Sequence, residues 1–313
     1  MKNTIKIDNN SRKILIIGAN GFLGKNLLQI KKTNNDYEDQ NLKFFAADLK
    51  NNNIPDDIPF YNIDITKRNE AIKKIKVISP DIIILTAALT NVDLCEIDKK
   101  YAAKLNTEGP KNIIQACKKT DSKLVFMSTD FVFDGTKEIG YYNEKDVPNP
   151  QNHYAKTKYN AEIALINSQI EYLICRTAVI YGWNLEKLNF ITWILSKLQN
   201  NEKISIVSTQ INNATFVTNL AQILLKLIEK EAIGVYHTAG DGALSRYEMA
   251  LKCAKFFNYN KDLITPLEML KQKALRPKNA GLDITKLKQM IGSELTIFSL
   301  DDGLNYMKKH RIE

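Results

Sequence analysis

The apolar positions of the chain fall into two patterns: short continuous runs, and longer stretches with helical spacing between them. Continuous apolar runs of about four to eight residues are typical of strands buried on both faces of a parallel sheet. The runs that we interpret as strands are, in chain order, residues 13–17, 42–47, 60–63, 82–86, 123–127, 173–180 and 235–239. The stretches between most of them carry apolar residues at helical spacing. This alternation predicts an α/β fold built on a doubly wound parallel sheet.

The alternation is less regular after residue 182. Residues 190–199 and a stretch from about Thr218 have helical spacing, and short strands are expected through Val207. Ser245 with Glu248 and Ser299 with Asp302 have the spacing of capping boxes, which mark helix starts. We therefore predict a smaller carboxyl-terminal α/β lobe, packed against the carboxyl ends of the sheet strands.

Composition excludes several classes of protein. With 313 residues and 44% hydrophobic content the chain can bury a full core, and its apolar runs are far shorter than the ~18 residues of a membrane helix. The net charge of +9 comes from lysines scattered among acids, so no nucleic-acid partner is predicted. The four cysteines and three histidines show no metal-ligand spacing. We expect a cytoplasmic protein that binds neither a metal nor a membrane.

The motif GANGFLG follows the first strand directly and leads into a helix. Gly18 can form the tight turn, Gly21 can let backbone amides approach a pyrophosphate, and Gly24 can let the helix pack closely. Such glycines are a weak signal alone, but a flanking strand and helix are the context of dinucleotide binding. The sequence therefore predicts a Rossmann-like sheet that binds NADH or NADPH.

Asp48 ends the second predicted strand, where an acidic residue can accept hydrogen bonds from the adenosine ribose. This position favours NAD, whereas Lys50 or Arg68 could instead bind the 2′-phosphate of NADP. A plain turn residue is the simpler explanation of Asp48. The cofactor preference stays open.

Tyr154 and Lys158 lie four residues apart in a predicted helix, with Cβ atoms roughly 6 Å apart on one face. A neighbouring cation favours the phenolate, so this pair could transfer a proton near neutral pH. By itself a YxxxK pattern is more often a buried ring beside a solvated amine. The pair gains weight from Thr129 and Asp130, which follow the fifth predicted strand at the edge where open sheets bind ligands.

Thr129 could hydrogen-bond a substrate carbonyl or the phenol of Tyr154, and Asp130 could accept from a sugar hydroxyl. A turn that caps the next segment explains the same residues without a ligand. Asn106 lies inside a predicted helix, where asparagine is unfavourable. It indicates either a local purpose, such as a kink or a bound water, or a tolerated exposed residue.

Six segments together resemble the extended short-chain dehydrogenase/reductase superfamily and, within it, the dTDP-4-dehydrorhamnose reductase family. The segments are GANGFLG at Gly18, AALTNVDLCE at Ala87, LNTEGP at Leu105, STDFVFDG at Ser128, YAKTK at Tyr154 and RPKNAGLD at Arg276. The resemblance extends over nearly the whole chain from about Lys13. Each segment is a modest signal, but their order and spacing are specific.

The resemblance implies a Rossmann-like sheet binding NAD(P)H and a carboxyl-terminal lobe holding a nucleotide-linked sugar. It implies Tyr154 as general acid, Lys158 as the residue that holds the nicotinamide ribose and lowers the tyrosine pKa, Thr129 as the residue that orients the carbonyl, and Asn106 in a proton relay. The expected cofactor contacts are Gly18, Asn20, Gly21, Phe22, Leu23, Gly24, Asp48, Asp64, Ile65, Ala87, Ala88, Thr90, Tyr154 and Lys158. The expected substrate contacts are Thr129, Asp130 and Val179.

The resemblance also divides the chain. Residues 1–12 are expected to be a disordered lead. Residues 13–182, with 214–240 returning to them, form the NAD(P)-binding domain, and residues 183–213 with 241–313 form the substrate-binding lobe. A homodimer is left open as the oligomeric state.

Two departures from the family pattern leave the sugar open. The family usually has tyrosine at the position of Phe131 and commonly a tryptophan where this chain has Val179. The related dehydratases have Thr-Asp-Glu at the fifth strand, and Phe131 in place of that glutamate argues against a dehydratase. Reduction of a 4-keto-6-deoxy nucleotide-sugar is the leading hypothesis. An epimerase, and a non-catalytic subunit that resembles the methionine adenosyltransferase β subunit, are the alternatives.

Overall fold

The structure is a computed structural model that describes residues 11–33, 42–52, 54–138, 140–184, 186–269 and 272–311. The first ten residues of the predicted lead therefore lie outside the described residues. Seven parallel strands form the central sheet, in the order β11-β6-β5-β4-β1-β2-β3. The order reverses between β1 and β4, which creates the crevice at which such sheets bind ligands. The predicted fold class is confirmed.

The strands of this sheet, in chain order, are β1 (Arg12–Ile17), β2 (Leu42–Asp48), β3 (Phe60–Asn62), β4 (Ile82–Leu85), β5 (Lys123–Thr129), β6 (Tyr172–Thr177) and β11 (Gly234–His237). Three two-stranded sheets join β7 (Ile180–Tyr181) with β10 (Thr215–Phe216), β9 (Ile211–Asn213) with β12 (Ala243–Ser245), and β8 (Ile204–Val207) with β13 (Ile264–Leu267).

The helices are α1 (Phe22–Thr33), α2 (Arg68–Ile78), α3 (Val92–Ile97), α4 (Lys99–Ala103), α5 (Gly109–Thr120), α6 (His153–Ile166), α7 (Phe190–Gln199), α8 (Val217–Glu229), α9 (Arg246–Phe257), α10 (Thr285–Ile291) and α11 (Leu300–Lys309). A π-helical segment (Lys104–Glu108) joins α4 to α5, and 3₁₀ turns occur at Asp130–Val132 and Lys261–Leu263. Among the described residues, no helix is long and apolar enough to span a membrane.

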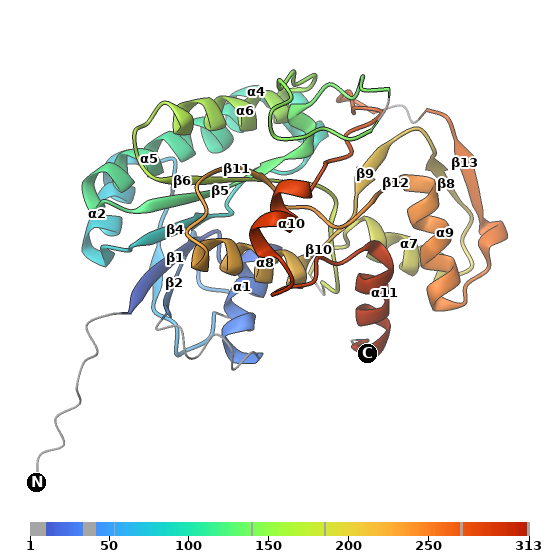
Figure 1. Ribbon diagram of the computed structural model, residues 1–313, viewed down its shortest axis with the longest axis horizontal. Coiled ribbons are helices and arrows are strands. Elements are labelled where there is room, and N and C mark those ends of the chain that lie inside the picture. The colour runs from blue at the N-terminus through green and yellow to red at the C-terminus, as the bar shows by residue number, and fades with distance from the viewer. Residues whose placement is uncertain are drawn as a thin grey trace, which may run out of the picture.

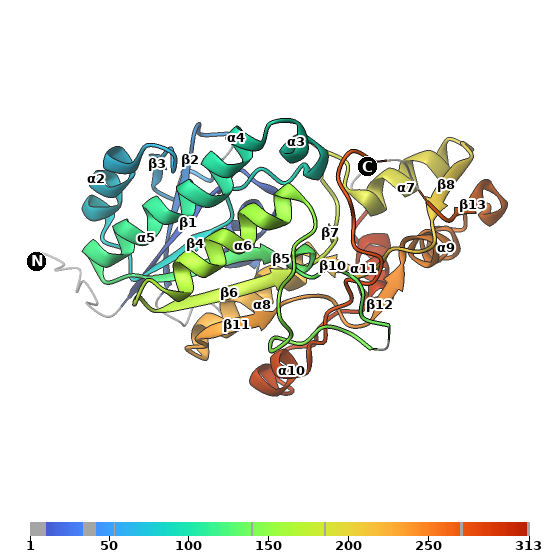
Figure 2. The same ribbon diagram turned by 90° about the horizontal axis from the view of Figure 1, so that it is seen from above.

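Helices cover both faces of the sheet (Figures 1 and 2). Leu15 and Ile17 of β1 face one core, to which α2, α5 and α6 contribute, whereas Ile14 and Ile16 face a second core with α1, α8 and α10. This alternation follows from the two-residue period of a strand, since successive side chains point to opposite faces. Both faces are apolar because both are covered, as the continuous apolar runs predicted.

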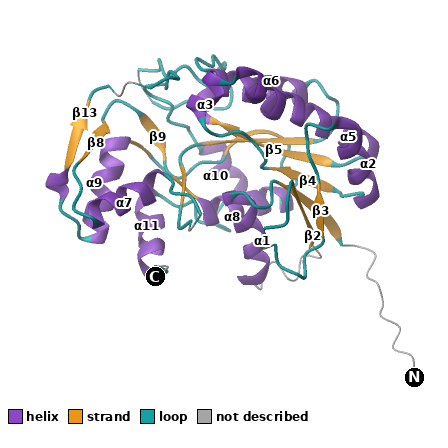
Figure 3. Cartoon of the chain, turned by 180° about the vertical axis from the view of Figure 1, so that it is seen from behind, coloured by secondary structure: helices purple, strands orange, loops and turns teal. Residues whose placement is uncertain are grey.

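A third core lies beside the carboxyl ends of the strands, between α7, α9 and α11 (Figure 3). Ile194, Met249 and Leu304 are fully buried there. Both predicted capping boxes are confirmed, at Ser245 for α9 and Ser299 for α11.

One sequence-based prediction of an element was wrong, and one element was not predicted. The run at 173–180 is not one strand, because β6 ends at Thr177 and β7 begins at Ile180. Val179 between them has φ +36°, a conformation that a β-branched residue rarely adopts and that ends the regular ladder. The short helix α3 was not predicted, because its six residues are too few to show a helical period.

Candidate active site

The glycine loop joins β1 to α1 and makes a cradle of backbone. Gly18 has φ +93°, and a Cβ there would lie 2.5 Å from the backbone nitrogen of Ala87. A Cβ on Gly24 would lie 2.3 Å from the carbonyl oxygen of Gly18, so this glycine permits the close packing of helix and loop. The first turn of α1 contains no acidic residue. Its free amides and the positive end of the helix dipole fit a pyrophosphate.

Asn20 and Asp48 fix the loop against the end of β2. The backbone N–H of Asn20 donates to Oδ2 of Asp48 (3.0 Å), and the backbone N–H of Leu49 donates to Oδ1 (2.7 Å). The side-chain amide of Asn20 donates to the carbonyl oxygen of Lys50 (2.6 Å). Asp48 is thus more than a turn residue, since its carboxylate positions the loop while keeping lone pairs that could accept from a ribose.

The other residues expected to contact the cofactor lie at the carboxyl ends of β3 and β4. Asp64 accepts from the backbone N–H and the hydroxyl of Thr66, and Ile65 is buried. Ala87 and Ala88 are partly buried, whereas Thr90 is exposed. After the glycine loop, the side chain of Leu23 is buried in the core, and the side chain of Phe22 is partly buried against that core. Of Leu23, therefore, only the backbone could contact a cofactor.

Thr129 and Asp130 stand at the end of β5, and both are buried. The hydroxyl of Thr129 donates to Oδ1 of Asp130 (3.0 Å), and Nδ2 of Asn212 donates to Oδ2 (2.6 Å). Nε of Arg246 donates to Oδ1 of Asn212 (3.2 Å), and its guanidinium lies 4.7 Å from the Phe190 ring centroid. Burial raises the pKa of Asp130 to about 6, although Asn212, Thr129 and Arg246 oppose the rise.

Asn212 and Arg246 were not found from the sequence. They come from β9 and from the first residue of α9, so they reach Asp130 from the carboxyl-terminal lobe, more than 80 residues away along the chain. No local pattern marks them, because an asparagine in a short strand and an arginine after a helix cap are ordinary surface residues. Only the folded chain brings them to the site.

Tyr154 lies in the first turn of α6, which begins after Asn152 caps it by accepting from the backbone N–H of Ala155 (2.8 Å). Burial is the largest influence on the phenol and raises its pKa well above the ordinary value, and the charge of Asp130 adds to the rise. The hydroxyl of Thr129 opposes it. The pKa of Tyr154 is thus shifted upward in the protein alone, the opposite of the fall expected from the neighbouring lysine.

Lys158 is 3% exposed, and its ammonium nitrogen lies 4.1 Å from the centroid of the Phe126 ring. Burial lowers its pKa to about 7, and the negative charge of Glu162 opposes this. A lysine with this pKa can gain or lose a proton at neutral pH. The ammonium and the phenol therefore have shifted pKa values for one main reason, which is removal from water.

Asn106 lies in the π-helical segment and is 1% exposed, so it is not a tolerated exposed residue. Its Oδ1 accepts from the backbone N–H of Leu89 (2.8 Å), and its Nδ2 donates to the carbonyl oxygen of Leu89 (3.0 Å) and to the hydroxyl of Thr157 (3.3 Å). The local purpose that the sequence indicated is a bridge from the end of β4 to α6. Single π-turns of this kind are frequent at functional sites.

Val179 is partly buried against the third core, and its carbonyl oxygen accepts from the backbone N–H of Thr215 (3.0 Å). Its left-handed backbone costs about 1–3 kcal/mol. Phe131 lies in the 3₁₀ turn and is partly buried. Val179 thus packs toward the core of the carboxyl-terminal lobe.

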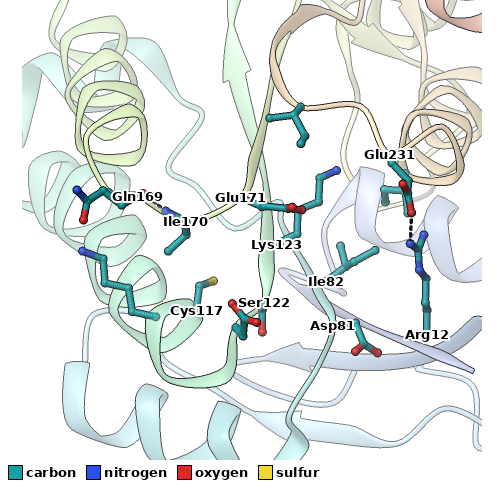
Figure 4. Close-up of a pocket in the computed structure, with 15 residues that line it drawn as sticks. Arg12, Asp81, Ile82, Cys117, Ser122, Lys123, Gln169, Ile170, Glu171 and Glu231 are labelled. Carbon is teal, nitrogen blue, oxygen red and sulfur yellow. Dashed lines mark hydrogen bonds and ion pairs between the residues drawn. The ribbon is translucent and has the colours of Figure 1, made fainter. Parts of the chain in front are cut away.

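A large hollow lies away from this site, at the amino-terminal ends of the strands. The cavity has a volume of about 790 Å³ and is lined by the starts of β1, β4 and β5, including Arg12, Asp81 and Lys123 (Figure 4). Among the described residues, no group of three or more His, Cys, Asp or Glu side chains could hold a metal, and all four cysteines are buried as free thiols.

Comparison with known proteins identifies the family. Residues 12–304 match the family described as the RmlD substrate binding domain. The dTDP-4-dehydrorhamnose reductase of Aggregatibacter actinomycetemcomitans is 30% identical, over 90% of this chain and 93% of that protein. Methionine adenosyltransferase 2 subunit beta of Bos taurus is 28% identical, over 93% of this chain and 86% of that protein. The chain belongs to the RmlD substrate binding domain family, and the predicted resemblance is confirmed.

Solved structures agree with this membership. The dTDP-4-dehydrorhamnose reductase of Bacillus anthracis, in complex with NADP, has a TM-score of 0.83 at 30% identity, covering 96% of this chain and 99% of that one. UDP-glucose 4-epimerase of Thermus thermophilus, in complex with NAD, has a TM-score of 0.76 at 16% identity, covering 95% of this chain and 99% of that one. The epimerase shows the shared fold alone.

Proposed function

We propose that this protein is an NAD(P)H-dependent oxidoreductase that reduces the 4-keto group of a nucleotide-linked 6-deoxysugar, as a dTDP-4-dehydrorhamnose reductase does. The observation that carries the proposal is that the Thr129 hydroxyl interacts with the phenol of Tyr154, with Lys158 one turn further along α6, at the same sheet edge as the glycine loop. Membership of the family supports it, as does the reductase structure that was solved with NADP.

The residues around the glycine loop would hold the cofactor. Amides of the α1 amino terminus suit its pyrophosphate, Asp48 would accept hydrogen bonds from the adenosine ribose, and Ala87 and Ala88 are small enough to let the dinucleotide approach the ends of the strands. A bound reduced nicotinamide supplies a hydride. The preference for NADH or NADPH stays open, because Asp48 and Lys50 lie beside each other at the end of β2.

Proton transfer is the task of Tyr154. A ketone that accepts a hydride at carbon becomes an alkoxide, which needs one proton to become the alcohol. The raised pKa of Tyr154 keeps the phenol protonated at neutral pH until charge develops on the substrate oxygen. Lys158, in its ammonium form, stabilises the phenolate that remains, and Thr129 orients the carbonyl by hydrogen bonding.

The carboxyl-terminal lobe offers positive charge for the nucleotide part of the substrate. The guanidinium of Arg246 lies over the ring of Phe190. Its pKa is lowered to about 10, mainly by burial and also by the charge of Arg276, while Asp130 opposes the fall. Arg276 itself forms a bidentate ion pair with Asp93. Guanidinium groups suit the diphosphate that links a nucleoside to a sugar. The network from Arg246 to Asp130 would connect diphosphate binding to the reacting end.

The proposal is tested by following NADPH and NADH absorbance with dTDP-4-keto-6-deoxysugars. We expect oxidation of one cofactor for each alcohol formed, and UDP-4-keto-6-deoxysugars serve as the comparison for the nucleotide. Absence of turnover with every such sugar, by protein that binds the cofactor, would contradict the proposal.

A second candidate is a non-catalytic cofactor-binding subunit, because the methionine adenosyltransferase β subunits are nearly as similar as the reductase. The retained Tyr154, Lys158 and Thr129 favour catalysis. Stoichiometric co-purification of a methionine adenosyltransferase, together with no reductase activity, would favour the subunit. The domain boundaries, the cytoplasmic location and the homodimer remain predictions.

A further inference from the structure

A buried ion pair between Glu162 and Arg176 lies one helical turn beyond Lys158, between α6 and β6. Glu162 is fully buried, and Arg176 on β6 is 3% exposed. Nε of Arg176 donates to Oε1 of Glu162 (3.1 Å), and Nη2 donates to Oε2 (2.7 Å). Ser128 on β5 donates its hydroxyl to Oε1 (2.5 Å). The carboxylate is thus clamped by two strands, both of which end at the site.

The ion pair is not the sole contact that holds the helix on the sheet. Apolar contacts of Ala161 and Leu165 already bury that face of α6. A buried ion pair is often no more stabilising than well-packed apolar residues of similar volume, because desolvation offsets the attraction. Glu162 and Arg176 therefore call for an explanation other than stability.

The position of Lys158 supplies one. Glu162 follows it by four residues on the same helical face, and Glu162 is the charge that favours the ammonium against burial. Within the described chain no carboxylate lies within 4 Å of this ammonium, whose other favourable contact is the ring of Phe126. The lysine is thereby kept free of a direct ion pair and available to face a ligand.

Other groups around α6 are charged or titratable, but they lie elsewhere. Tyr154 is on the same helix. Asp130 on the 3₁₀ turn and Cys95 on α3 both act on its phenol. Glu96 of α3 and Lys99 at the start of α4 contact His153 at the beginning of α6.

The remaining elements packed on α6 add no second carboxylate beside the lysine. The π-helical segment contributes the neutral Asn106 and Thr107, and Lys118 of α5 lies by the far end of the helix, near Asn167. His237 on β11 lies next to Arg176, and its pKa is lowered to about 3, so it is uncharged at neutral pH.

We propose that Glu162, held by Arg176 and Ser128, is a positioning residue that keeps Lys158 charged and turned toward the nicotinamide side of the site. Arg176 binds both oxygens of the Glu162 carboxylate and thereby weakens its attraction for Lys158, so the ammonium does not form a direct ion pair with Glu162. The inference rests on the proposed function for its role in reduction, but the state of Lys158 can be measured without any substrate.

The experiment uses two substitutions with opposite expected signs. Glu162→Gln removes the negative charge and should lower the pKa of Lys158 by about one unit or more, whereas Arg176→Gln removes a positive charge and should raise it. A structural role alone would give both variants the same effect, since each breaks the same ion pair. Glu162→Asp keeps the charge and should restore most of the wild-type value.

The pKa of Lys158 is read from the ¹³C NMR titration of ε-labelled lysine, with the signal assigned by Lys158→Met. Glu171→Gln, at the exposed far edge of the sheet, is the matched control and should leave the titration unchanged. In active protein, the alkaline limb of kcat/KM should move to lower pH in Glu162→Gln, because the ammonium is then lost earlier.

Equal titration of Lys158 in wild type and Glu162→Gln, or a shift of the same sign in both variants, would overturn the inference. If Glu162→Gln does not fold, the inference is tested by Arg176→Gln alone, in which the pKa of Lys158 should rise. If the wild type proves inactive with keto-sugars, the proposed function fails while the NMR titration still tests the role of Glu162.

Discussion

The two edges of the central sheet carry different kinds of polar group. At the carboxyl edge, Asp130 and Lys158 are each 3% exposed, and burial moves both pKa values toward neutrality. At the amino edge, Arg12 and Glu231 form an ion pair in water, with side chains 45% and 72% exposed, beside the large cavity (Figure 4). Buried ionisable side chains, which cost free energy to bury, therefore indicate the functional site better than the volume of a cavity does.

Lys123 is the exception that sharpens this contrast. It lies at the amino edge, is 8% exposed and has a pKa lowered by burial, as Lys158 does. The charges that act on it, however, are those of Glu171, Glu231 and Arg12, and the glycine loop lies at the other edge of the sheet. A shifted lysine alone is therefore not a catalytic site, and the neighbouring groups decide its role.

The largest effect is expected from Tyr154→Phe at the carboxyl edge. Loss of the phenolic proton should lower kcat about 10²–10⁴-fold, because Tyr154 is the proton donor in the proposed reaction and the Thr129 hydroxyl only orients the carbonyl by hydrogen bonding. Cofactor affinity should stay within about twofold, as measured by NADPH fluorescence. Near wild-type turnover in this variant would exclude the phenol as the proton donor.

The next effect concerns the cradle. In Gly24→Ala the new Cβ would lie 2.3 Å from the carbonyl oxygen of Gly18, so loop and helix must separate. NADPH affinity should fall about tenfold or more. Gly292→Ala is the control, since this glycine has φ +61° but open space around it, and the variant should lose about 1 kcal/mol of stability with unchanged NADPH affinity. Unchanged affinity in Gly24→Ala would argue against the pyrophosphate cradle.

A third prediction uses the pH dependence of Asp130. Its pKa is raised to about 6 in the folded protein, so the folded state binds the proton more tightly than the unfolded chain. This group therefore stabilises the fold below about pH 4 and loses that contribution as pH rises through 6. Relative to Asp130→Asn, the wild type should lose about 2 kcal/mol between pH 4 and 7 in urea denaturation. A constant difference would show that the pKa is not raised.

The smallest effect is expected at the amino edge. Arg12→Ala should cost about 0–1 kcal/mol in urea unfolding, because exposed ion pairs are screened by water and salt. Cofactor affinity should be unchanged, since the pair lies at the opposite edge from the glycine loop. A loss of NADPH affinity would couple the two edges and weaken the contrast drawn between them.

The sequence predicted the features that are local and missed those that depend on distant residues. Strands and helices followed from apolar periods, and Gly18, Tyr154 and Lys158 from motifs with fixed spacing. The break at Val179 escaped because the run around it is uniformly apolar. The upward shift of the Tyr154 pKa in the protein alone could not be predicted from the sequence because burial, its largest cause, is a property of the folded chain.

The partners of Asp130 escaped for a related reason. Asn212 and Arg246 lie on elements of the carboxyl-terminal lobe. The hydrophobic periodicity of the sequence does not indicate that these elements contact the end of β5. Glu162 was visible as part of a helix but gains meaning only from Arg176 and Ser128, which the sheet brings beneath it.

Tracing the hydride tests reduction by this site most directly. In a single-turnover experiment, the protein is mixed with a dTDP-4-keto-6-deoxysugar and with NADPH that carries deuterium at the C4 position from which the hydride is transferred. The product is then examined by NMR. We expect one deuterium at C4 of the product sugar for each NADPH oxidised in the wild type, and almost no product in Tyr154→Phe. Formation of an alcohol without deuterium at C4, or retention of all the deuterium in a bound cofactor, would contradict reduction by this site.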